Sequence, residues 1–466
     1  MNAPAWLERA VFYQIYPQSF FDANDDGIGD LAGIEAKLDY LTDLGVNALW
    51  INPCYASPFL DAGYDVVDHV RIDPRYGTNA DMERLLAAAH ARDIRVCLDL
   101  VAGHTADAHP WFEASCAPEP NALSDRYVWT NNPWVKRDGE LDFISGTTDR
   151  SGAYAINFFA HQPALNYGFA QPVRSYQQAM DAPGPRATKA ALLEIMAYWL
   201  DRGVDGFRVD LAGSLVKGDP EHVGIRRLWR EVTQWLRERY DDRVLIAEWG
   251  RPELAIDAGF DVDFLLHVGT PGYDALLLGP ATFPPRRTHP YFDDEARGDF
   301  ATFLRSFDFH QQQIRGRGYI AIPSSNHDMS RPSHGRDVAD LMVLYTFLLT
   351  WPHVPFIYYG DEIGMRYVAE QPSKEGGYQR TGSRTPMQWD ASPSAGFTRH
   401  ANPYLPVDSQ SGRPDVATQR DQKDSLWHHV NRLIYLRSTE RDLMASASLE
   451  LLTDASPGYP PGVPPG

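Results

Sequence analysis

Short apolar runs alternate with longer segments whose apolar residues recur every three or four positions, and this pattern covers most of the chain. Such alternation predicts βα units arranged around a parallel sheet. The strand-like runs are rich in β-branched and aromatic residues and lie at residues 11–16, 46–52, 95–101, 206–211, 244–249, 262–268, 319–323 and 355–359. Helices are expected at residues 31–44, 81–92, 188–202, 221–240, 301–315, 337–351 and 425–442.

Eight strands separated by helices favour an α/β fold of the (β/α)8 barrel type, although an open, doubly wound sheet with the same strand count stays open as an alternative. Residues 104–170 break the alternation with a stretch rich in Trp, Asn, Pro and Gly that is too long for an ordinary connection. We expect it to form a small inserted domain, with residues 1–103 and 171–442 making the barrel. The Pro- and Gly-rich tail within residues 443–466 is expected to be disordered.

One apolar segment is long enough in principle to cross a bilayer. Residues 341–359 contain no Asp, Glu, Lys or Arg over 19 positions. However, Pro352, His353 and Pro355 interrupt the segment. Because proline ends a helix, a buried helix followed by a buried strand is the better interpretation.

Composition places the chain among folded proteins, with 43% hydrophobic and 23% charged residues out of 466. The net charge of −19 would repel phosphate backbones and anionic lipid headgroups, so neither nucleic acid nor membrane is an expected partner. The three cysteines are too few for a disulfide framework and have no zinc-binding spacing. Together with an N-terminus that lacks a secretory pattern, they predict a cytoplasmic protein.

Polar residues gather where the predicted strands end, which is the face of a barrel that bears catalytic groups. Carboxylates crowded at such ends are costly to bury, and they are expected where chemistry needs one ionised and one protonated group. Two carboxyl groups with unequal pKa values are the minimum equipment for cleaving a glycosidic bond. The strand-end residues are Asp99, His104, Arg208, Asp210, Glu248, Asn326, His327 and Asp328.

These residues lie in motifs that resemble a known family. The segments Asp-Leu-Val-Ala-Gly-His (99–104), Gly-Phe-Arg-Val-Asp (206–210), Glu-Trp (248–249) and Asn-His-Asp (326–328) resemble the four signature regions of the α-amylase superfamily of glycoside hydrolases, in the same order. The segments Gln-Pro-Ala-Leu-Asn (162–166) and Arg-Thr-Pro-Met-Gln-Trp (384–389) are similar to the branch that contains oligo-1,6-glucosidase, α-glucosidase and trehalose synthase. The resemblance runs from residue 11 to about residue 442.

The resemblance implies a role for each matching residue. Asp210 resembles the nucleophile that forms a glycosyl-enzyme intermediate, Glu248 the general acid/base, and Asp328 the third carboxylate, which holds sugar hydroxyls. The matching substrate-binding residues are Asp61, Tyr64, His104, Arg208, His327 and Arg380. Among them, Tyr64 resembles the platform under the cleaved sugar, and the pair Asp61 and Arg380 would close the site beyond one terminal glucose.

A loop near the N-terminus has the spacing of a cation site. Oxygen-bearing residues alternate around a glycine turn, an arrangement that suits a hard cation such as Ca²⁺. In this family the loop resembles a structural Ca²⁺ site, and no organic cofactor is implied. The residues concerned are Asp22, Asn24, Asp26, Ile28 (through its carbonyl) and Asp30.

Four positions depart from the family pattern. Gly103 replaces the Asn that helps bind a second Ca²⁺ in α-amylases, and Ala164 replaces a usual Asp. Leu211 follows the nucleophile where a smaller or β-branched residue often reports linkage preference, and Thr381 stands where the branch has Asp. The family's C-terminal β-sandwich is reduced to a remnant at residues 443–466, which could leave the last helix with exposed apolar surface.

The sequence therefore predicts a retaining exo-α-glucosidase or α-glucosyltransferase that acts on a small α-glucoside, with a sugar or alcohol as acceptor. Trehalose synthase and sucrose-processing activity are the alternatives within the family. A non-catalytic sugar-binding homologue is a further alternative, which the three retained carboxylates disfavour. The linkage and the oligomeric state are left open.

Overall fold

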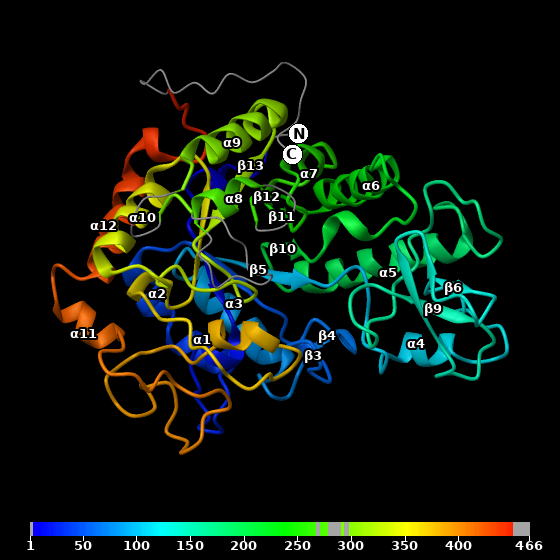
Figure 1. The fold of residues 1–466 in the computed structure, drawn as a ribbon, viewed down its shortest axis with the longest axis horizontal. Helices are drawn as coiled ribbons and strands as arrows, with labels where there is room; N and C mark the ends of the chain where they lie inside the picture. Colours follow the sequence, from blue (N-terminus) through cyan, green and yellow to red (C-terminus); the bar gives the residue numbers. More distant parts are fainter. Residues whose placement is uncertain (1–2, 267–270, 278–289, 293–297, 451–466) are drawn as a thin grey trace.

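Eight parallel strands close into a barrel in the computed structural model, which describes residues 3–266, 271–277, 290–292 and 298–450. The strands follow chain order around the barrel, and Phe12 pairs with Phe356 to close it. Several of the barrel strands are labelled in Figure 1. All eight predicted strands are confirmed, and closure excludes the open, doubly wound alternative. They are β1 (Phe12–Ile15), β2 (Ala48–Ile51), β5 (Arg95–Leu100), β10 (Gly206–Val209), β11 (Val244–Ala247), β12 (Val262–Phe264), β13 (Tyr319–Pro323) and β14 (Val354–Tyr358).

The strands are almost entirely buried, which explains why they read as unbroken apolar runs rather than as alternating ones. The predicted run 262–268 is a strand only over its first three residues, and its last two residues lie outside the described part of the chain. Phe264 projects into the barrel, where its ring packs against Trp50 and Phe356.

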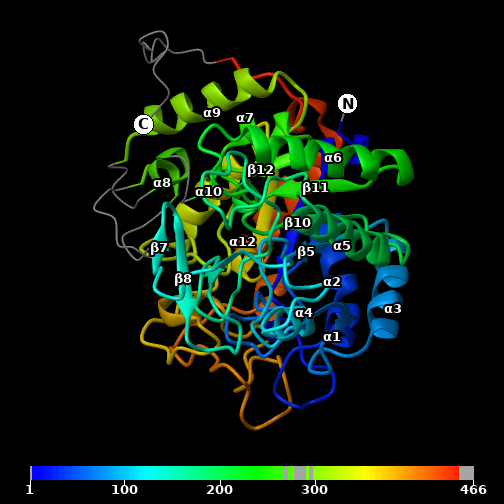
Figure 2. The ribbon, with the colours of Figure 1, turned by 90° about the vertical axis from the view of Figure 1, so that its right-hand side faces the viewer.

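The longer helices form the outer layer, as Figure 2 shows for α3, α5 and α6. The predicted helix 31–44 is wrong in one respect, because it is two helices that meet at Lys37. The Lys37 ammonium lies 4.0 Å from the Phe21 ring centroid and 4.1 Å from that of Trp389. Helices are α1 (Leu31–Ala36), α2 (Leu38–Leu44), α3 (Asn79–His90), α4 (Pro110–Ser115), α5 (Pro183–Leu200), α6 (Val223–Arg239), α7 (Pro252–Asp257), α8 (Pro271–Leu276), α9 (Phe300–Ile314), α10 (Val338–Thr350), α11 (Val416–Asp421) and α12 (Leu426–Thr439).

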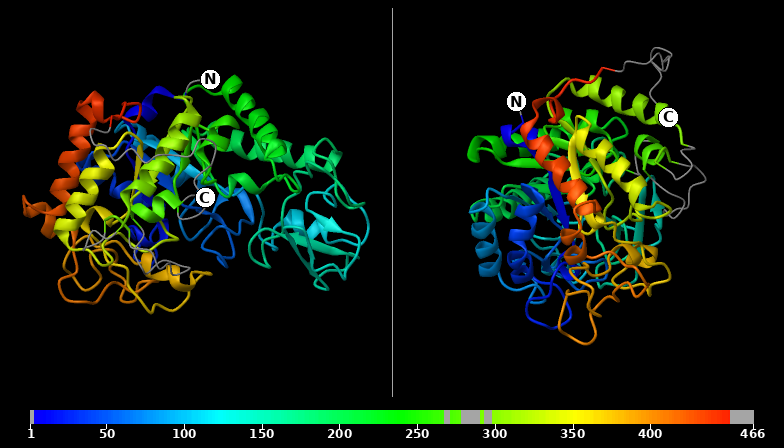
Figure 3. Two further views of the ribbon diagram at one scale, coloured as in Figure 1. Left: turned by 45° about the horizontal axis from the view of Figure 1, so that its top comes forward. Right: turned by 90° about the vertical axis from the view of Figure 1, so that its left-hand side faces the viewer.

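The apolar segment 341–359 is part of helix α10 followed by strand β14, as predicted. Asp337 and Asp340 form a capping box that fixes where α10 begins. Among the described residues, no helix has the length and apolar character needed to span a membrane. Helix α12 packs beside α10 on the outside of the barrel (Figure 3, right).

A small antiparallel sheet follows β5 and lies to one side of the barrel (Figure 3, left). It falls within the segment 104–170 that the sequence assigns to an inserted domain, and it has its own apolar cluster around Leu141 and Phe143. Leu165 joins it to the barrel by donating its backbone N–H to the Gly103 carbonyl. Its strands are β6 (Trp129–Thr130), β7 (Arg137–Asp138), β8 (Leu141–Ser145) and β9 (Ala153–Ile156), and a separate two-stranded sheet contains β3 (Tyr55–Ala56) and β4 (Asp68–Ile72).

The predicted tail 443–466 lies outside the described residues from residue 451 onward. On α12, Tyr435 is 69% exposed and Leu436 is 41% exposed, in line with the apolar surface expected there. Leu433 instead packs partly against the core.

Candidate active site

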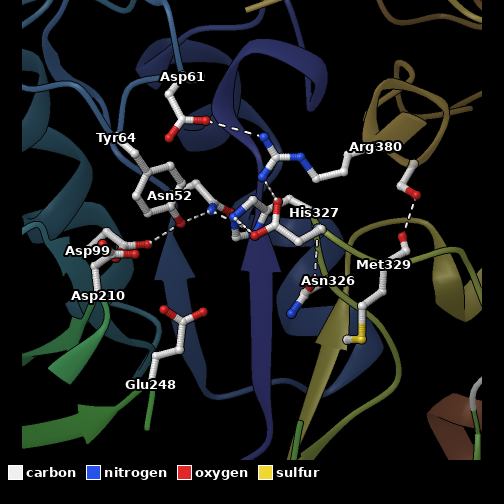
Figure 4. A network of polar contacts seen from close by, with 12 residues as sticks. Asn52, Asp61, Tyr64, Asp99, Asp210, Glu248, Asn326, His327, Met329 and Arg380 are labelled. Atoms are coloured by element: carbon white, nitrogen blue, oxygen red, sulfur yellow. Dashed lines mark hydrogen bonds and ion pairs between the residues drawn. The ribbon is translucent and has the colours of Figure 1, made fainter. Parts of the chain in front are cut away.

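The predicted catalytic residues come together at the carboxyl ends of the barrel strands. Asp210 follows β10, Glu248 follows β11, and Asp328 lies beyond the end of β13. Figure 4 shows Asp210 and Glu248 facing the same space, with Asp61 and Arg380 across from them. One pocket is lined by Asp61, Tyr64, His104, Phe158, Gln162, Asp210, Leu211, Glu248, Asp328 and Arg380.

Arg208 lies beneath this pocket and is almost fully buried. One terminal nitrogen (Nη1) lies 2.7 Å from Asp99 Oδ1 and 3.1 Å from Asp210 Oδ1. The other (Nη2) forms an ion pair with Glu248. A single guanidinium therefore contacts three carboxylates, and Asp210 and Glu248 are close enough to share it.

Burial is the main cause that raises the pKa of Asp210 well above its ordinary value, and the negative charge of Glu248 raises it further. Arg208 acts in the opposite direction by favouring the ionised form. A proton on Glu248 would remove the repulsion that it exerts on Asp210. Asp210 and Glu248 therefore repel each other when both are ionised, and Arg208 offsets part of that repulsion.

Tyr64 is held by hydrogen bonds on both sides of its hydroxyl group. It donates to Asp99 Oδ2 at 2.9 Å and accepts from Asn52 Nδ2 at 2.9 Å. Its ring stacks on that of His327, with centroids 5.3 Å apart and planes 8° apart. The ring is therefore fixed in the pocket wall, as a platform under a sugar requires.

His327 is buried and neutral, since burial lowers its pKa to about 3. The amide of Gln14 lies 2.9 Å from its Nδ1, which must accept that bond. The proton is therefore on Nε2, which lies 3.4 Å from Asp328 Oδ2.

His104 also lines the pocket and is neutral, because burial lowers its pKa to about 4. Its Nε2 lies 2.9 Å from the Tyr64 carbonyl oxygen, and its Nδ1 lies 3.0 Å from Asn157 Nδ2. Both ring nitrogens thus have protein partners, and the role of His104 in binding a sugar hydroxyl stays a prediction.

Asp61 and Arg380 meet across 319 positions of sequence. Arg380 lies in a short 3₁₀ helix (Tyr378–Ser383), and its Nη2 is 3.3 Å from Asp61 Oδ1 while its Nη1 is 2.8 Å from Asp328 Oδ1. Gln162 donates to the other Asp61 oxygen at 2.8 Å. The arrangement forms a polar wall at one end of the pocket.

Some site residues received no role from the sequence. Arg384 donates to Asp328 Oδ1 at 2.8 Å and to the His327 carbonyl at 2.8 Å, so Asp328 is shared between two arginines. The motif 384–389 marked the segment without indicating this contact. Phe158 is 60% exposed and lines the pocket, although only its aromatic character could have suggested it.

The loop predicted to hold Ca²⁺ is closed by hydrogen bonds of its own. Asp22 accepts from the backbone N–H of Asp25 at 2.8 Å and of Gly27 at 2.7 Å, and Asp30 caps α1 through Gly33. Among the described residues, no three His, Cys, Asp or Glu side chains are grouped to hold a metal ion. The oxygen atoms of this loop, with the Ile28 carbonyl among them, are of the kind that binds Ca²⁺. The Ca²⁺ site stays a prediction.

The barrel and the inserted segment meet at a position where Gly103 departs from the family pattern. A Cβ on Gly103 would lie 2.9 Å from Asn157 Nδ2, so Asn157 occupies the space beside it. The Lys217 ammonium donates to the Ser214 carbonyl at 2.6 Å and lies 3.3 Å from Asn157 Oδ1. The ammonium of Lys217 therefore places a positive charge at this junction, where the family pattern has the Asn that helps bind a second Ca²⁺.

A closed parallel barrel with polar side chains at its carboxyl-end face is the arrangement of many barrel enzymes, and a close pair of carboxyl groups there suits the cleavage or transfer of glycosidic bonds. The model of the α-amylase catalytic domain matches residues 14–446, and the chain belongs to this family of glycoside hydrolases.

The chain is 30% identical to an oligo-1,6-glucosidase of Parageobacillus thermoglucosidasius over 97% of its own length and 87% of that protein. It is 31% identical to a trehalose synthase/amylase of Mycolicibacterium smegmatis over 97% and 79% of the two chains. Among solved structures it is similar to isomaltulose synthase from a Klebsiella species, with 28% identity, a TM-score of 0.78, and coverage of 95% of this chain and 86% of that one. These relatives include both hydrolases and synthases.

Proposed function

We propose that the chain is a retaining, exo-acting α-glucosidase or α-glucosyltransferase for small α-glucosides. The observation that carries this proposal is the polar wall of Asp61 and Arg380, which stands across the pocket from Asp210 and Glu248. A wall that closes this end of the pocket would hold one terminal sugar beside Asp210 and Glu248 and stop a longer chain from passing through.

The shared arginine supports retention of configuration. Asp210 and Glu248 contact two nitrogens of one guanidinium, which keeps the two carboxyl groups close together. Retaining enzymes need a separation of about 5–5.5 Å, whereas inverting enzymes leave room for a water molecule between their carboxyl groups.

In the proposed first step, Asp210 attacks the anomeric carbon as the glycosidic C–O bond breaks, and Glu248 gives its proton to the leaving oxygen. This leaves a β-glucosyl ester on Asp210 and a carboxylate on Glu248. In the second step, Glu248 takes a proton from water or from an acceptor hydroxyl, whose oxygen displaces Asp210. The α-configuration is thereby restored.

Asp328 and its two arginines support binding of the sugar hydroxyls. Arg380 and Arg384 both donate to Asp328 Oδ1, and Asp328 Oδ2 lies 3.4 Å from His327 Nε2. A carboxylate oxygen held in this way can accept hydrogen bonds from two adjacent hydroxyl groups, and such bonds strengthen as positive charge develops on the ring.

Isomerisation is the second candidate, because the similar proteins include a trehalose synthase and an isomaltulose synthase. The chemistry at Asp210 is the same, and the outcomes differ only in whether water or the released sugar meets the glucosyl enzyme. A cytoplasmic location is part of the proposal and is supported by three unpaired cysteines.

Time-resolved proton NMR with maltose, isomaltose, trehalose, sucrose and kojibiose tests the proposal, with Asp210→Asn as the control. Release of α-glucose as the first anomer, lost in Asp210→Asn, would support a retaining exo-glucosidase and identify the linkage. New disaccharides formed without free glucose would favour isomerisation. Release of β-glucose as the first anomer from trehalose or sucrose, which have no reducing-end glucose, would contradict the retaining mechanism.

A further inference from the structure

Asp263 is a buried carboxylate that contacts the segment bearing Glu248 and has no part in the mechanism so far. It lies on β12, next to β11 in the barrel, and its side chain is fully buried. Its Oδ1 accepts from the Trp249 N–H at 3.0 Å and, more weakly, from Gly250 at 3.4 Å. Its Oδ2 accepts from the Arg251 N–H at 2.9 Å.

The three N–H groups belong to the three residues directly after Glu248. Gly250 has a φ of +71°, a left-handed conformation that lets consecutive N–H groups converge on one anion. Burial raises the pKa of Asp263, while these backbone N–H bonds favour its ionised form. Every contact is a donor, so the carboxylate form matches the site best.

This segment also determines where the nucleophile loop lies. The backbone N–H of Ala212 donates to the Glu248 carbonyl at 3.0 Å, and the N–H of Leu211 donates to Glu248 Oε2 at 3.1 Å. A Cβ on Gly213 would come within 2.3 Å of Trp249 Nε1, so the Trp249 ring lies directly against that loop. The backbone that Asp263 holds is therefore in contact with the loop that follows Asp210.

We propose that Asp263 is a positioning residue for acid/base catalysis, because it anchors residues 249–251 and so aims Glu248 at the leaving-group oxygen. The inference rests on the proposed function, in which Glu248 protonates that oxygen. Asp263 touches neither substrate nor reacting atoms and acts only through the backbone after Glu248.

Asp263→Asn is the direct test, since it keeps the shape of the side chain and removes the charge. In either orientation, the asparagine NH₂ group faces at least one backbone N–H that now lacks an acceptor. The turn must shift to relieve this contact, and Glu248 moves with it.

The informative measurement is kcat/KM for α-glucosides that differ in the leaving group. α-Glucosyl fluoride needs little protonation to leave, whereas phenyl and methyl α-glucosides depend on the acid. General acid catalysis contributes about 10²–10⁴-fold. We expect Asp263→Asn to lose about 10- to 100-fold on phenyl and methyl α-glucosides and less than about threefold on the fluoride.

Asp261→Asn is the matched control, because Asp261 is also a buried carboxylate on the same stretch of chain. It binds Arg237 and the Leu245 N–H at the opposite end of the strand. Its loss should lower thermal stability and leave the ratio between leaving groups unchanged.

A uniform loss across all leaving groups in Asp263→Asn, or the same ratio as in Asp261→Asn, would overturn the inference. If Asp263→Asn does not fold, Gly250→Ala strains the same turn through its backbone. The ratio of kcat/KM between the leaving groups in that variant then tests the inference. A wild type that cleaves none of these α-glucosides would refute the proposed function and this inference with it. An active wild type with an unaltered leaving-group ratio in the variant refutes this inference alone.

Discussion

Replacing Arg380 by alanine removes the cation from the polar wall that closes the pocket. Arg380 is 19% exposed and contacts Asp61 at 3.3 Å and Asp328 at 2.8 Å. At an effective dielectric constant of about 20, each contact has a Coulomb energy of about 5–6 kcal/mol, most of which is offset by dehydration. Breaking a buried pair by removing one partner costs about 3–5 kcal/mol.

The loss here should lie below that range, because both carboxylates keep another partner. Arg384 still lies 2.8 Å from Asp328, and Gln162 still donates to Asp61 at 2.8 Å. We expect a loss of about 2 kcal/mol in the free energy of unfolding. Because Arg380 also holds Asp61 and Asp328 in place at the pocket, we expect about a 30-fold decrease in kcat/KM on maltose, which corresponds to about 2 kcal/mol in transition-state binding.

The variant should also change with pH in a defined direction. Burial raises the pKa of Asp61, and Arg380 is the strongest influence that lowers it. Without Arg380 this pKa rises further, so the folded protein holds the Asp61 proton more tightly than the unfolded chain does. The free energy of unfolding then falls as the pH rises above the unfolded value of the carboxyl, and Arg380→Ala should be more destabilised at about pH 8 than at about pH 5.

The assay combines initial rates on maltose with the products formed from maltopentaose. The wild type should release only glucose, whereas Arg380→Ala should also release longer fragments because the wall is open. Arg71→Ala, in an exposed pair with Asp68, controls for the loss of a surface charge. Wild-type kcat/KM together with glucose as the sole product in Arg380→Ala would refute the assignment of this wall.

Three further outcomes are expected. Glu248→Gln should lower kcat/KM on maltose by about 10²–10⁴-fold but leave α-glucosyl fluoride nearly unaffected, and equal losses on both would contradict the acid/base role. If the loop around Asp22 binds Ca²⁺, EDTA should lower the melting temperature and leave the turnover near room temperature almost unchanged. Calorimetry that shows no shift in the melting temperature would refute the Ca²⁺ site. Glu362 accepts from Tyr13 and Tyr40, and burial raises its pKa to about 7 from an ordinary value of 4.5, so the stability it contributes at low pH is lost as the pH rises toward 7. Over that pH window, the free energy of unfolding measured by denaturant titration should fall by about 3 kcal/mol less in Glu362→Gln than in the wild type. The same pH dependence in both proteins would refute this role of Glu362.

The strands were predictable because each is buried on both faces and reads as an apolar run. Helix boundaries were less so. The helix breaks at Lys37, whose ammonium group lies over the rings of Phe21 and Trp389, and no local pattern reveals this packing. Helix α5 begins five residues before the predicted start because Pro183 suits the first turn of a helix, a signal that apolar periodicity does not use.

The residues of the site differ in the same way in how far the sequence predicts them. Motif order was enough to bring Asp210, Glu248 and Asp328 to one face, because parallel strands of a barrel all end on that face. The contacts of Arg384 with Asp328 and of Asp263 with residues 249–251 are different in kind. They depend on how loops fold back over the barrel, and that information lies in tertiary packing rather than in spacing along the chain.

The charges in the pocket are arranged in two groups that suit different parts of a neutral substrate. At the wall, Arg380 and Arg384 face Asp61 and Asp328, so cations and carboxylates are equal in number where sugar hydroxyls would bind. Beneath the reacting bond, one arginine faces three carboxylates, Asp99, Asp210 and Glu248. In the proposed reaction, this excess negative charge would stabilise the positive charge that develops at the anomeric carbon. One arginine shared by three carboxylates thus leaves net negative charge at this end of the pocket, whereas an arginine paired with a single carboxylate would leave none.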